Sequence, residues 1–298
     1  MRSQPILAVG SIALDTIHTA SERHTDILGG SATFFAVSAA SLAQVRLVGV
    51  VGDDYPEEGW RLFRDKGVDV SDVQQVAGRT FRWGGEYSKD FSTRETLFTE
   101  LGVFEDFEPK INAANRDTPI VYLGNIQPSL QLAVCNRVSD QSRIISDTMN
   151  LWIDNNRAEL TEVIRRSHIF LINDEEAEEF TGISDPEAGA SALLEQGPEI
   201  VIIKQGGKGA LLATSNGRRH IPVYPDVQVL DPTGAGDSFA GGLLCYLSVH
   251  GEGSLLDAVI NAAATASFTV EGVGLDGLLK ADVGSIRKRA DVITALMD

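Results

Sequence analysis

The segment DPTGAGDSFAGG, residues 231–242, places three residues with little or no side chain at the start of a helical run. Gly234, Ala235 and Gly236 leave their backbone N–H groups accessible, and such groups at a helix N-terminus bind anions. Asp237 follows directly. A carboxylate at this position either caps the helix or accepts a proton from a hydroxyl group beside the bound anion. Mutation would reduce stability in the first case and reaction rate in the second.

Short, β-branched apolar runs alternate with helical patterns along the rest of the chain. The predicted strands cover residues 6–9, 45–51, 120–123, 143–146, 169–172, 200–204 and 209–214. The predicted helices cover residues 31–43, 57–66, 129–139, 155–167, 175–181, 186–195, 237–248, 255–269 and 283–296. Strands that are apolar along their whole length are buried on both faces, and their alternation with helices is typical of βαβ units. We therefore predict an α/β fold with a largely parallel sheet.

Two segments break this alternation. Residues 79–104 interleave aromatic, Thr and charged residues without helical periodicity, which suits a small sheet with one face in water. Residues 11–28, above all 11–20, have a similar composition. We predict that both segments form a β-sheet appendage over the main domain. This appendage is either a lid or an edge hairpin without a gating role.

Composition and charge exclude several classes of protein. The 298 residues, 43% hydrophobic and 22% charged, are typical of a folded chain, and we expect one domain over residues 1–298. The net charge of −17 opposes broad binding to nucleic acid or to an anionic membrane, because both are polyanions. We therefore expect neither as a partner.

The cysteines and the apolar stretches indicate the compartment. Cys135 and Cys245 are isolated from each other and lack metal-ligand spacing, so we expect reduced thiols in a cytoplasmic protein. The most apolar long stretch, residues 29–52, contains Gln44 and Arg46 near its middle. A bilayer span needs about 20 consecutive apolar residues, so we predict no membrane segment.

Four features, in this order along the chain, resemble the ribokinase-like (PfkB) carbohydrate kinase family. They are GSIALD at 10–15, GGSA at 29–32, NDEE at 173–176, and DPTGAGDSFAGG. The resemblance covers essentially the whole chain. It implies a three-layer α/β/α fold with a mostly parallel central sheet and a small β-sheet lid. It also implies transfer of the γ-phosphoryl group of ATP to a hydroxyl of a small sugar or sugar-like metabolite.

The resemblance assigns roles to the glycine-rich segment. Asp237 would be the general base, and the amides of Gly234, Ala235 and Gly236 would form the anion hole. Asp231 is expected to help coordinate K⁺, by resemblance to members that a monovalent cation activates. Pairing of lids in this family implies a homodimer.

The resemblance also implies contacts with the acceptor. Asp15 would bind substrate hydroxyls, and Gly29, Gly30 and Ser31 would bring the backbone close to the ligand. The commoner family pattern has an Asn a few residues after the glycine pair, where this chain has Thr33-Phe34-Phe35. If Phe34 faces the pocket, the acceptor gains an aromatic surface, whereas a ring in the core says nothing about the acceptor. Arg94 in the lid and Asn125 after a predicted strand are further candidates.

The nucleotide and its metal ion are expected at two other glycine- or acid-rich turns. The resemblance places the nucleotide near Asn173, Lys204, Gly206, Gly207, Gly209 and Asn261. Glu176 is expected to organise Mg²⁺ through water, since Mg²⁺ prefers oxygen ligands and keeps several waters. The alternatives are a solvated acidic helix face at 174–179, a hairpin with solvated lysines at 204–209, and helix packing by Asn261.

Other enzyme classes lack support. A dinucleotide-binding G-x-G-x-x-G after the first strand is absent, and so is a P-loop. Two alternatives remain. A nucleoside kinase on the same fold is favoured if Phe34, Phe35 or Trp83 stacks on a base. A non-catalytic sugar-binding protein is disfavoured, because it would need neither Asp237 nor the Gly-Ala-Gly loop.

Overall fold

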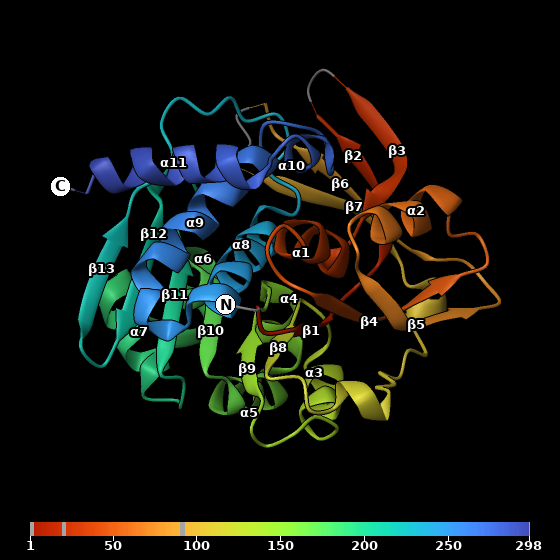
Figure 1. Ribbon diagram of the computed structural model, residues 1–298, viewed down its shortest axis with the longest axis horizontal. Coiled ribbons are helices and arrows are strands. Elements are labelled where there is room, and N and C mark those ends of the chain that lie inside the picture. The colour runs from red at the N-terminus through yellow and green to blue at the C-terminus, as the bar shows by residue number, and fades with distance from the viewer. Residues whose placement is uncertain (1–2, 20–21, 90–92, 298) are drawn as a thin grey trace.

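The computed structural model describes residues 3–19, 22–89 and 93–297, without the Arg94 side chain (Figure 1). The strands of the large sheet are β1 (Ile6–Val9), β4 (Val45–Gly52), β5 (Asp69–Val76), β8 (Ile120–Leu123), β9 (Arg143–Ser146), β10 (Ile169–Asn173), β11 (Ile200–Lys204), β12 (Ala210–Thr214) and β13 (Gly217–Ile221). Within the described residues their order is β13-β12-β11-β10-β9-β8-β1-β4-β5. Only β12 and β13 run antiparallel to their neighbours. The predicted α/β fold with a mostly parallel sheet is therefore confirmed.

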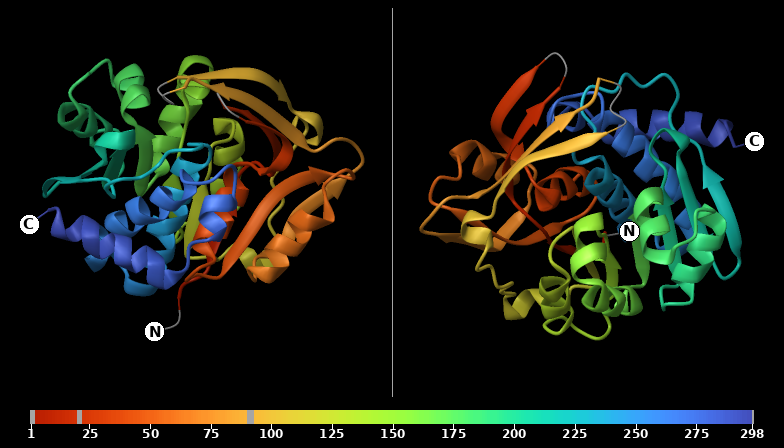
Figure 2. Two further views of the ribbon diagram at one scale, coloured as in Figure 1. Left: turned by 90° about the horizontal axis from the view of Figure 1, so that it is seen from above. Right: turned by 180° about the vertical axis from the view of Figure 1, so that it is seen from behind.

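Helices cover both faces of the large sheet (Figures 1 and 2). One face carries α1 (Ser31–Ala39), α2 (Glu57–Asp65), α8 (Ala235–His250), α9 (Leu255–Thr269) and α11 (Val283–Ala295), with α10 (Asp276–Leu279) beside α1. The other face carries α3 (Pro128–Cys135), α4 (Asn150–Asn155), α5 (Arg157–Arg166), α6 (Asp174–Thr181) and α7 (Pro186–Leu194). Alternate strand residues enter opposite cores: on β1, Ile6 faces the first helix layer and Leu7 the second.

A second, four-stranded sheet lies outside the three layers in the described part of the chain. It consists of β2 (Ala13–His18), β3 (Arg23–Gly29), β6 (Phe81–Tyr87) and β7 (Arg94–Glu100), in the order β3-β2-β6-β7. These strands fall in the two segments whose composition predicted an appendage, and we call this sheet the lid sheet. In Figure 1 it projects at the upper right, beside α1 and α10.

A buried arginine connects the lid sheet to the main domain. The Arg82 side chain, 10% exposed, forms ion pairs at 2.8 Å with Asp26 in β3 and with Asp54 after β4. Asp54 also accepts hydrogen bonds from the backbone and hydroxyl of Thr80. Asp26 belongs to the lid sheet and Asp54 to the main domain, so the bonds of Asp54 to Arg82 and Thr80 hold the base of the lid sheet on the main domain.

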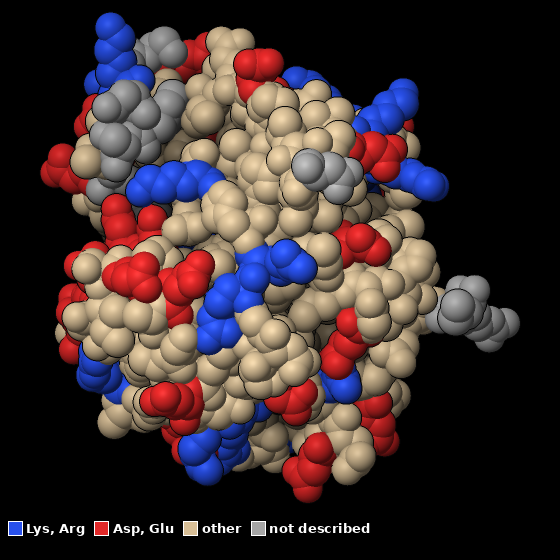
Figure 3. All heavy atoms as spheres, turned by 90° about the vertical axis from the view of Figure 1, so that its left-hand side faces the viewer, with Lys and Arg blue, Asp and Glu red and all other residues tan. Residues whose placement is uncertain are grey.

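The surface shows mixed charge on the face nearest β13. Figure 3 shows Lys and Arg side chains among Asp and Glu side chains there, with no continuous basic area. In the described residues, none of the helices has the length and apolar character that a membrane crossing requires.

Candidate active site

Polar side chains gather where the central strands end. Asn173 and Lys204 are the last residues of β10 and β11 and lie opposite each other in register. Asp147 follows β9 directly. Helix α8, which carries Asp237 in its first turn, starts at the same edge. Ligands of open α/β sheets bind at the carboxyl ends of the strands, so this edge is the candidate site.

The glycine-rich loop reaches α8 through a left-handed turn. Gly234 has φ 73°, and a Cβ atom there would lie 2.3 Å from the Phe34 ring, so only glycine fits. The Ala235 N–H donates to the Pro232 carbonyl at 3.2 Å. Among the hydrogen bonds of the described residues, the N–H groups of Gly234 and Gly236 have no acceptor. The predicted anion hole is thus corrected from three free amides to two, because Ala235 closes the turn.

Asp237 lies among charged and polar groups. Burial raises its pKa to about 7, and the negative charge of Asp147 adds to this, while the Lys204 ammonium and the Tyr122 hydroxyl oppose it. Tyr122, fully buried in β8, stacks its ring on Phe35 at 4.1 Å. Its hydroxyl forms no hydrogen bond of ordinary geometry within the described chain, although it lies close to the Asp237 carboxylate. A carboxyl group with a pKa near 7 suits a general base at neutral pH.

Lys204 forms a buried ion pair beside the glycine-rich loop. Its Nζ atom donates to Asp147 Oδ2 at 2.6 Å, and the Asp147 side chain is 4% exposed. A Cβ atom at residue 236 would lie 3.2 Å from Lys204 Nζ. Burial alone would lower the pKa of Lys204, but the carboxylates of Asp147, Glu176 and Asp237 outweigh burial and raise it. The ammonium therefore stays charged next to the loop amides.

Asp15 brings the lid sheet to the same place. Its carboxylate, 4% exposed, packs on Gly29, where a Cβ atom would lie 1.9 Å from Oδ2. Burial raises its pKa to about 7; a hydrogen bond from the Gly30 backbone opposes this shift, and the charges of Asp231 and Asp237 add to it. Asp15 and Asp237 are thus close enough to interact, as a shared acceptor would require.

The glycine pair and Ser31 have separate local roles. Gly30 has φ 91°, and a Cβ atom there would lie 2.4 Å from the Ser11 carbonyl oxygen. Ser31 and Ser11 each accept a hydrogen bond at 3.1 Å from the other's backbone N–H. These bonds tie the start of α1 to the turn after β1. Ser31 therefore fixes the backbone next to Gly30.

The three other predicted acceptor contacts are Phe34, Asn125 and Arg94, and the structure decides the orientation of Phe34 alone. The Phe34 ring lies in the core, 1% exposed, beneath Gly234. It fills the space that the missing side chain of Gly234 leaves, so the predicted contact of Phe34 with the substrate is withdrawn. Asn125 accepts a hydrogen bond from Trp152 Nε1 at 2.8 Å and contacts Met149, at the end of β8. The Arg94 side chain lies outside the described residues.

Asn173 and Glu176 form a capping box at the start of α6. Asn173 Oδ1 accepts from the Glu176 N–H at 2.7 Å, and Glu176 Oε2 accepts from the Asn173 N–H at 3.0 Å. Within the described ranges, no group of three or more His, Cys, Asp or Glu side chains could hold a metal ion. The donor set at Glu176 fits Mg²⁺ only as part of a nucleotide complex, in which phosphate oxygens and water supply the other ligands.

The remaining nucleotide candidates divide into open and packed positions. Gly206 and Gly207 are exposed, with open space where a Cβ atom would lie. Gly209 instead packs against the Ile221 carbonyl oxygen. Asn261 donates from Nδ2 to the Gly242 carbonyl at 2.7 Å, so it holds α9 against α8, and the adenine contact expected of it is withdrawn.

Asp231 ties the glycine-rich loop to the chain after α9. One carboxylate oxygen accepts from the Thr233 N–H at 2.9 Å and the other from the Gly274 N–H at 2.8 Å. The side chain is fully buried. Each oxygen of the carboxylate therefore already has one backbone donor.

Three side chains at this site were not predicted from the sequence. Asp147 had a detectable signal, since it follows a strand at the carboxyl edge as Asn173 does. Tyr122 read as an ordinary strand residue. Tyr87, on β6 of the lid sheet, donates or accepts a 2.8 Å hydrogen bond with the Thr233 hydroxyl, and no local pattern predicts that contact.

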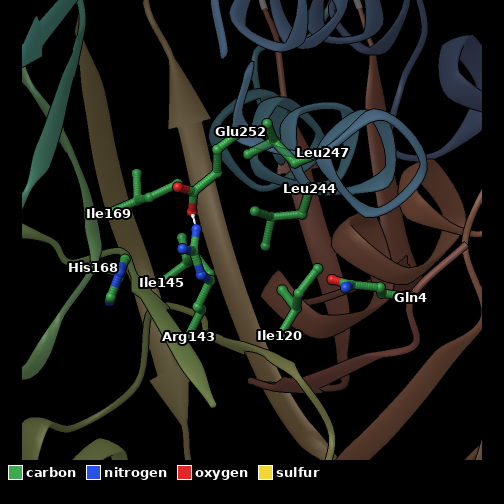
Figure 4. A pocket seen from close by; sticks show the side chains of 10 residues that line it. Gln4, Ile120, Arg143, Ile145, His168, Ile169, Leu244, Leu247 and Glu252 are labelled. Carbon is green, nitrogen blue, oxygen red and sulfur yellow. Dashed lines mark ion pairs between the residues drawn. The ribbon is translucent and has the colours of Figure 1, made fainter. Parts of the chain in front are cut away.

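A cavity of about 300 Å³ lies at the opposite end of the sheet (Figure 4). Ile120, Ile145 and Leu244 line it, and Arg143 forms an ion pair with Glu252 across it. It borders the amino ends of β8, β9 and β10. Because ligands of parallel sheets bind at the carboxyl ends, we do not assign the acceptor or the nucleotide to this cavity.

Known proteins resemble this chain over nearly its full length. Residues 4–281 match the model of the "pfkB family carbohydrate kinase". A cytidine kinase from Thermococcus kodakarensis is 31% identical over 250 residues, which are 82% of this chain and 88% of the relative. The crystal structure of Methanocaldococcus jannaschii nucleoside kinase superposes with a TM-score of 0.80, at 23% identity, over 98% of this chain and 99% of that chain. A putative Escherichia coli ribokinase in complex with ATP and Mg²⁺ has a TM-score of 0.83, at 18% identity, over 97% and 99% of the two chains.

Proposed function

This chain belongs to the PfkB family of carbohydrate kinases and is a phosphotransferase that acts on hydroxyl groups, and we propose that it transfers the γ-phosphoryl group of ATP to a nucleoside. The acceptor group would be the hydroxymethyl of the ribosyl ring. The observation that carries the kinase assignment is the Asp237 carboxylate beside two free loop amides and the Lys204 ammonium.

The reaction uses this chain's residues in three roles. Asp237 accepts the acceptor's hydroxyl proton while the acceptor oxygen forms a bond to the γ phosphorus. The bond from that phosphorus to the bridging oxygen breaks, and ADP leaves with the electron pair. The N–H groups of Gly234 and Gly236, with Lys204, stabilise the negative charge on the transferred group. Asp15 positions the acceptor by accepting hydrogen bonds from ribosyl hydroxyls.

Trp83 favours a nucleoside over a free sugar. It lies opposite Asp15 in the register of β2 and β6, so both side chains project from the same face of the lid sheet. A Cβ atom at Gly85 would lie 2.1 Å from the Trp83 ring, so the indole occupies the space over that glycine on this face. A flat aromatic ring next to the hydroxyl-binding carboxylate offers a stacking surface for a nucleobase. The name of the cytidine kinase relative agrees with this choice.

Mg²⁺ would enter with ATP and neutralise charge on its phosphates. Glu176 would hold it through water, next to Asn173 and Lys204. K⁺ at Asp231 and pairing of two chains through their lid sheets complete the proposal. The K⁺ site is tested by replacing K⁺ with Na⁺ in the assay. Pairing is tested by light scattering, which compares the molecular mass of the wild type with that of Leu97→Glu, a variant at an exposed residue of the lid sheet.

An acceptor screen tests the proposal directly. Release of ADP is measured with cytidine, other nucleosides, ribose, fructose and aldonates, each with ATP and Mg²⁺. We expect nucleosides to have the highest kcat/KM, and Trp83→Ala to reduce it about 10- to 100-fold for nucleosides, since stacking contributes roughly 1–3 kcal/mol per base. Trp60→Ala, in α2 and outside the lid sheet, is the matched control. A free sugar that outperforms every nucleoside, unaffected by Trp83→Ala, would contradict the nucleoside assignment.

A further inference from the structure

Asp147 forms an ion pair with Lys204 inside the site, and no role is yet assigned to Asp147. A buried ion pair loses more hydration than its attraction returns unless its geometry is good and further hydrogen bonds support it, so it is weak evidence for stability. Here the pair stands at the carboxyl edge, with its ammonium next to Gly236. This position suggests a function in catalysis.

Asp147 is held on several sides. Its N–H donates to the Leu123 carbonyl at 3.0 Å, and its own carbonyl accepts from Gln131 Nε2 at 3.0 Å. Its Oδ1 accepts from the Thr148 N–H at 2.9 Å, which leaves Oδ2 for Lys204. A carboxylate with so many fixed contacts is a rigid anchor for the long, flexible lysine side chain.

Three carboxylates lie close enough to attract the Lys204 ammonium, namely those of Asp147, Glu176 and Asp237. Without Asp147, the Lys204 ammonium would turn towards Asp237. There it would occupy the carboxylate that has to accept the proton of the acceptor hydroxyl. With Asp147 in place, the Nζ atom lies beside Gly236 and one of the two free loop amides.

We propose that Asp147 is a positioning residue, which holds the Lys204 ammonium against the glycine-rich loop so that the ammonium binds the γ-phosphoryl group and stays away from Asp237. This inference deepens the proposed function and rests on it. Asp147 itself touches neither the nucleotide nor the acceptor. Its effect on the γ-phosphoryl group passes through Lys204, and its charge also raises the pKa of Asp237.

The test is a double-mutant cycle with Asp147→Asn, Lys204→Met and the double variant. We expect each single variant to lose about 10- to 100-fold in kcat, because a misplaced group of this kind has an effect of that size. The cycle is measured at pH 8.5, where Asp237, with a pKa of about 7, is ionised in every variant. There we expect the double variant to resemble Lys204→Met, since Asp147 then acts on the reaction through Lys204. If the loss in kcat of the double variant equalled the product of the two single losses, the inference would be overturned. A wild-type kcat in Asp147→Asn would also overturn it.

Nucleotide binding without acceptor gives a readout that is independent of turnover. Calorimetry with Mg²⁺ should show that both single variants lose affinity for ATP but little affinity for ADP, since the ammonium meets the γ-phosphoryl group. Equal losses for ATP and ADP would contradict the proposed contact. The pH profile adds a third readout: the acidic limb of kcat/KM should move to lower pH in Asp147→Asn, because a negative neighbour of Asp237 is gone and Lys204 is released towards it.

The controls separate folding and function from the inference. Asp147→Asn removes the carboxylate that is hydrogen-bonded to the buried ammonium, so the thermal unfolding of this variant is measured. If Asp147→Asn does not fold, the double variant, in which both members of the pair are neutral, replaces it. In that case an unchanged preference for ATP over ADP in the double variant would overturn the inference. Glu252→Gln breaks the surface ion pair with Arg143 at the other end of β9 (Figure 4) and should change neither kcat nor binding. If the wild type did not bind ATP, the proposed function would be refuted. If the wild type is active and Asp147→Asn has the same kcat, only the inference is refuted.

Discussion

The carboxylate of Asp15 occupies the space that a side chain at Gly29 would fill. The two residues belong to neighbouring strands of the lid sheet, and the absence of a side chain on one allows the other to stay at the site.

Gly29→Ala should therefore displace Asp15 and weaken acceptor binding. A Cβ atom cannot coexist with Oδ2 at 1.9 Å, so the carboxylate must turn away. We expect KM for the acceptor to rise about 10-fold or more, with ATP affinity unchanged. Gly253→Ala, where a Cβ atom meets open space, is the control. Initial rates over a range of acceptor concentrations measure the effect, and an unchanged KM would contradict the placement of Asp15.

Activity should rise with pH through about 7, since Asp237 accepts a proton only when ionised and its pKa is about 7. Tyr122→Phe removes a hydroxyl that stabilises the ionised form, so the acidic limb of kcat/KM should move to higher pH. Charges of Asp147 and Lys204 act on the same group and are unchanged in this variant. Tyr55→Phe, another buried tyrosine, is the control. If the acidic limb of kcat/KM lay at the same pH in Tyr122→Phe and the wild type, the Tyr122 hydroxyl would not act on Asp237.

Asp15→Asn should stabilise the fold at alkaline pH. The folded-state pKa of Asp15 is raised from 3.8 to about 7, so the free energy of unfolding falls as pH rises from about 3.8 to about 7, and the loss is complete above pH 7. Below pH 3.8 the side chain is neutral in both states, and the difference should vanish. Thermal unfolding at pH 8.5 and pH 3.5 should show a gain on the order of 1–4 kcal/mol only at the higher pH. The same gain in Asp53→Asn, at an exposed residue, would contradict this explanation.

The hydrogen bond between Tyr87 and Thr233 joins the lid sheet to the glycine-rich loop. Tyr87→Phe should loosen lid closure, so that water enters and ATP hydrolysis without acceptor increases. We expect kcat/KM for the acceptor to fall by about 5-fold, as for the loss of one hydrogen bond of about 1 kcal/mol. Thr233→Val should have the same effect and add nothing to Tyr87→Phe. Tyr246→Phe is the matched control, and unchanged hydrolysis in Tyr87→Phe would show that the bond has no gating role.

Local patterns were sufficient for the central strands and for most helices. Buried strands such as β10 are apolar along their whole length, and α8 follows a glycine-rich turn, so neither depended on distant contacts. The edge strands β5 and β13 escaped prediction because their sequences, DVSDVQQV and GRRHI, are largely polar. The short helices α4 and α10 lack the length that makes a helical period visible.

The site was predictable where one residue's chemistry defines its role. Asp237, Asp15 and Lys204 do lie together, because strand ends and the start of α8 share one edge. Directions of side chains were not predictable. Phe34 turned out to lie beneath Gly234, and Tyr122 to reach Asp237, through contacts between elements far apart in the sequence.

The central claim is that Asp237 removes the acceptor proton, and the kcat of Asp237→Asn tests it most directly. ADP release is measured at saturating ATP and acceptor, with calorimetry to confirm that both still bind. The proposed role predicts a loss of about 10²- to 10⁴-fold in kcat with binding retained. Wild-type kcat in a folded Asp237→Asn protein would contradict it.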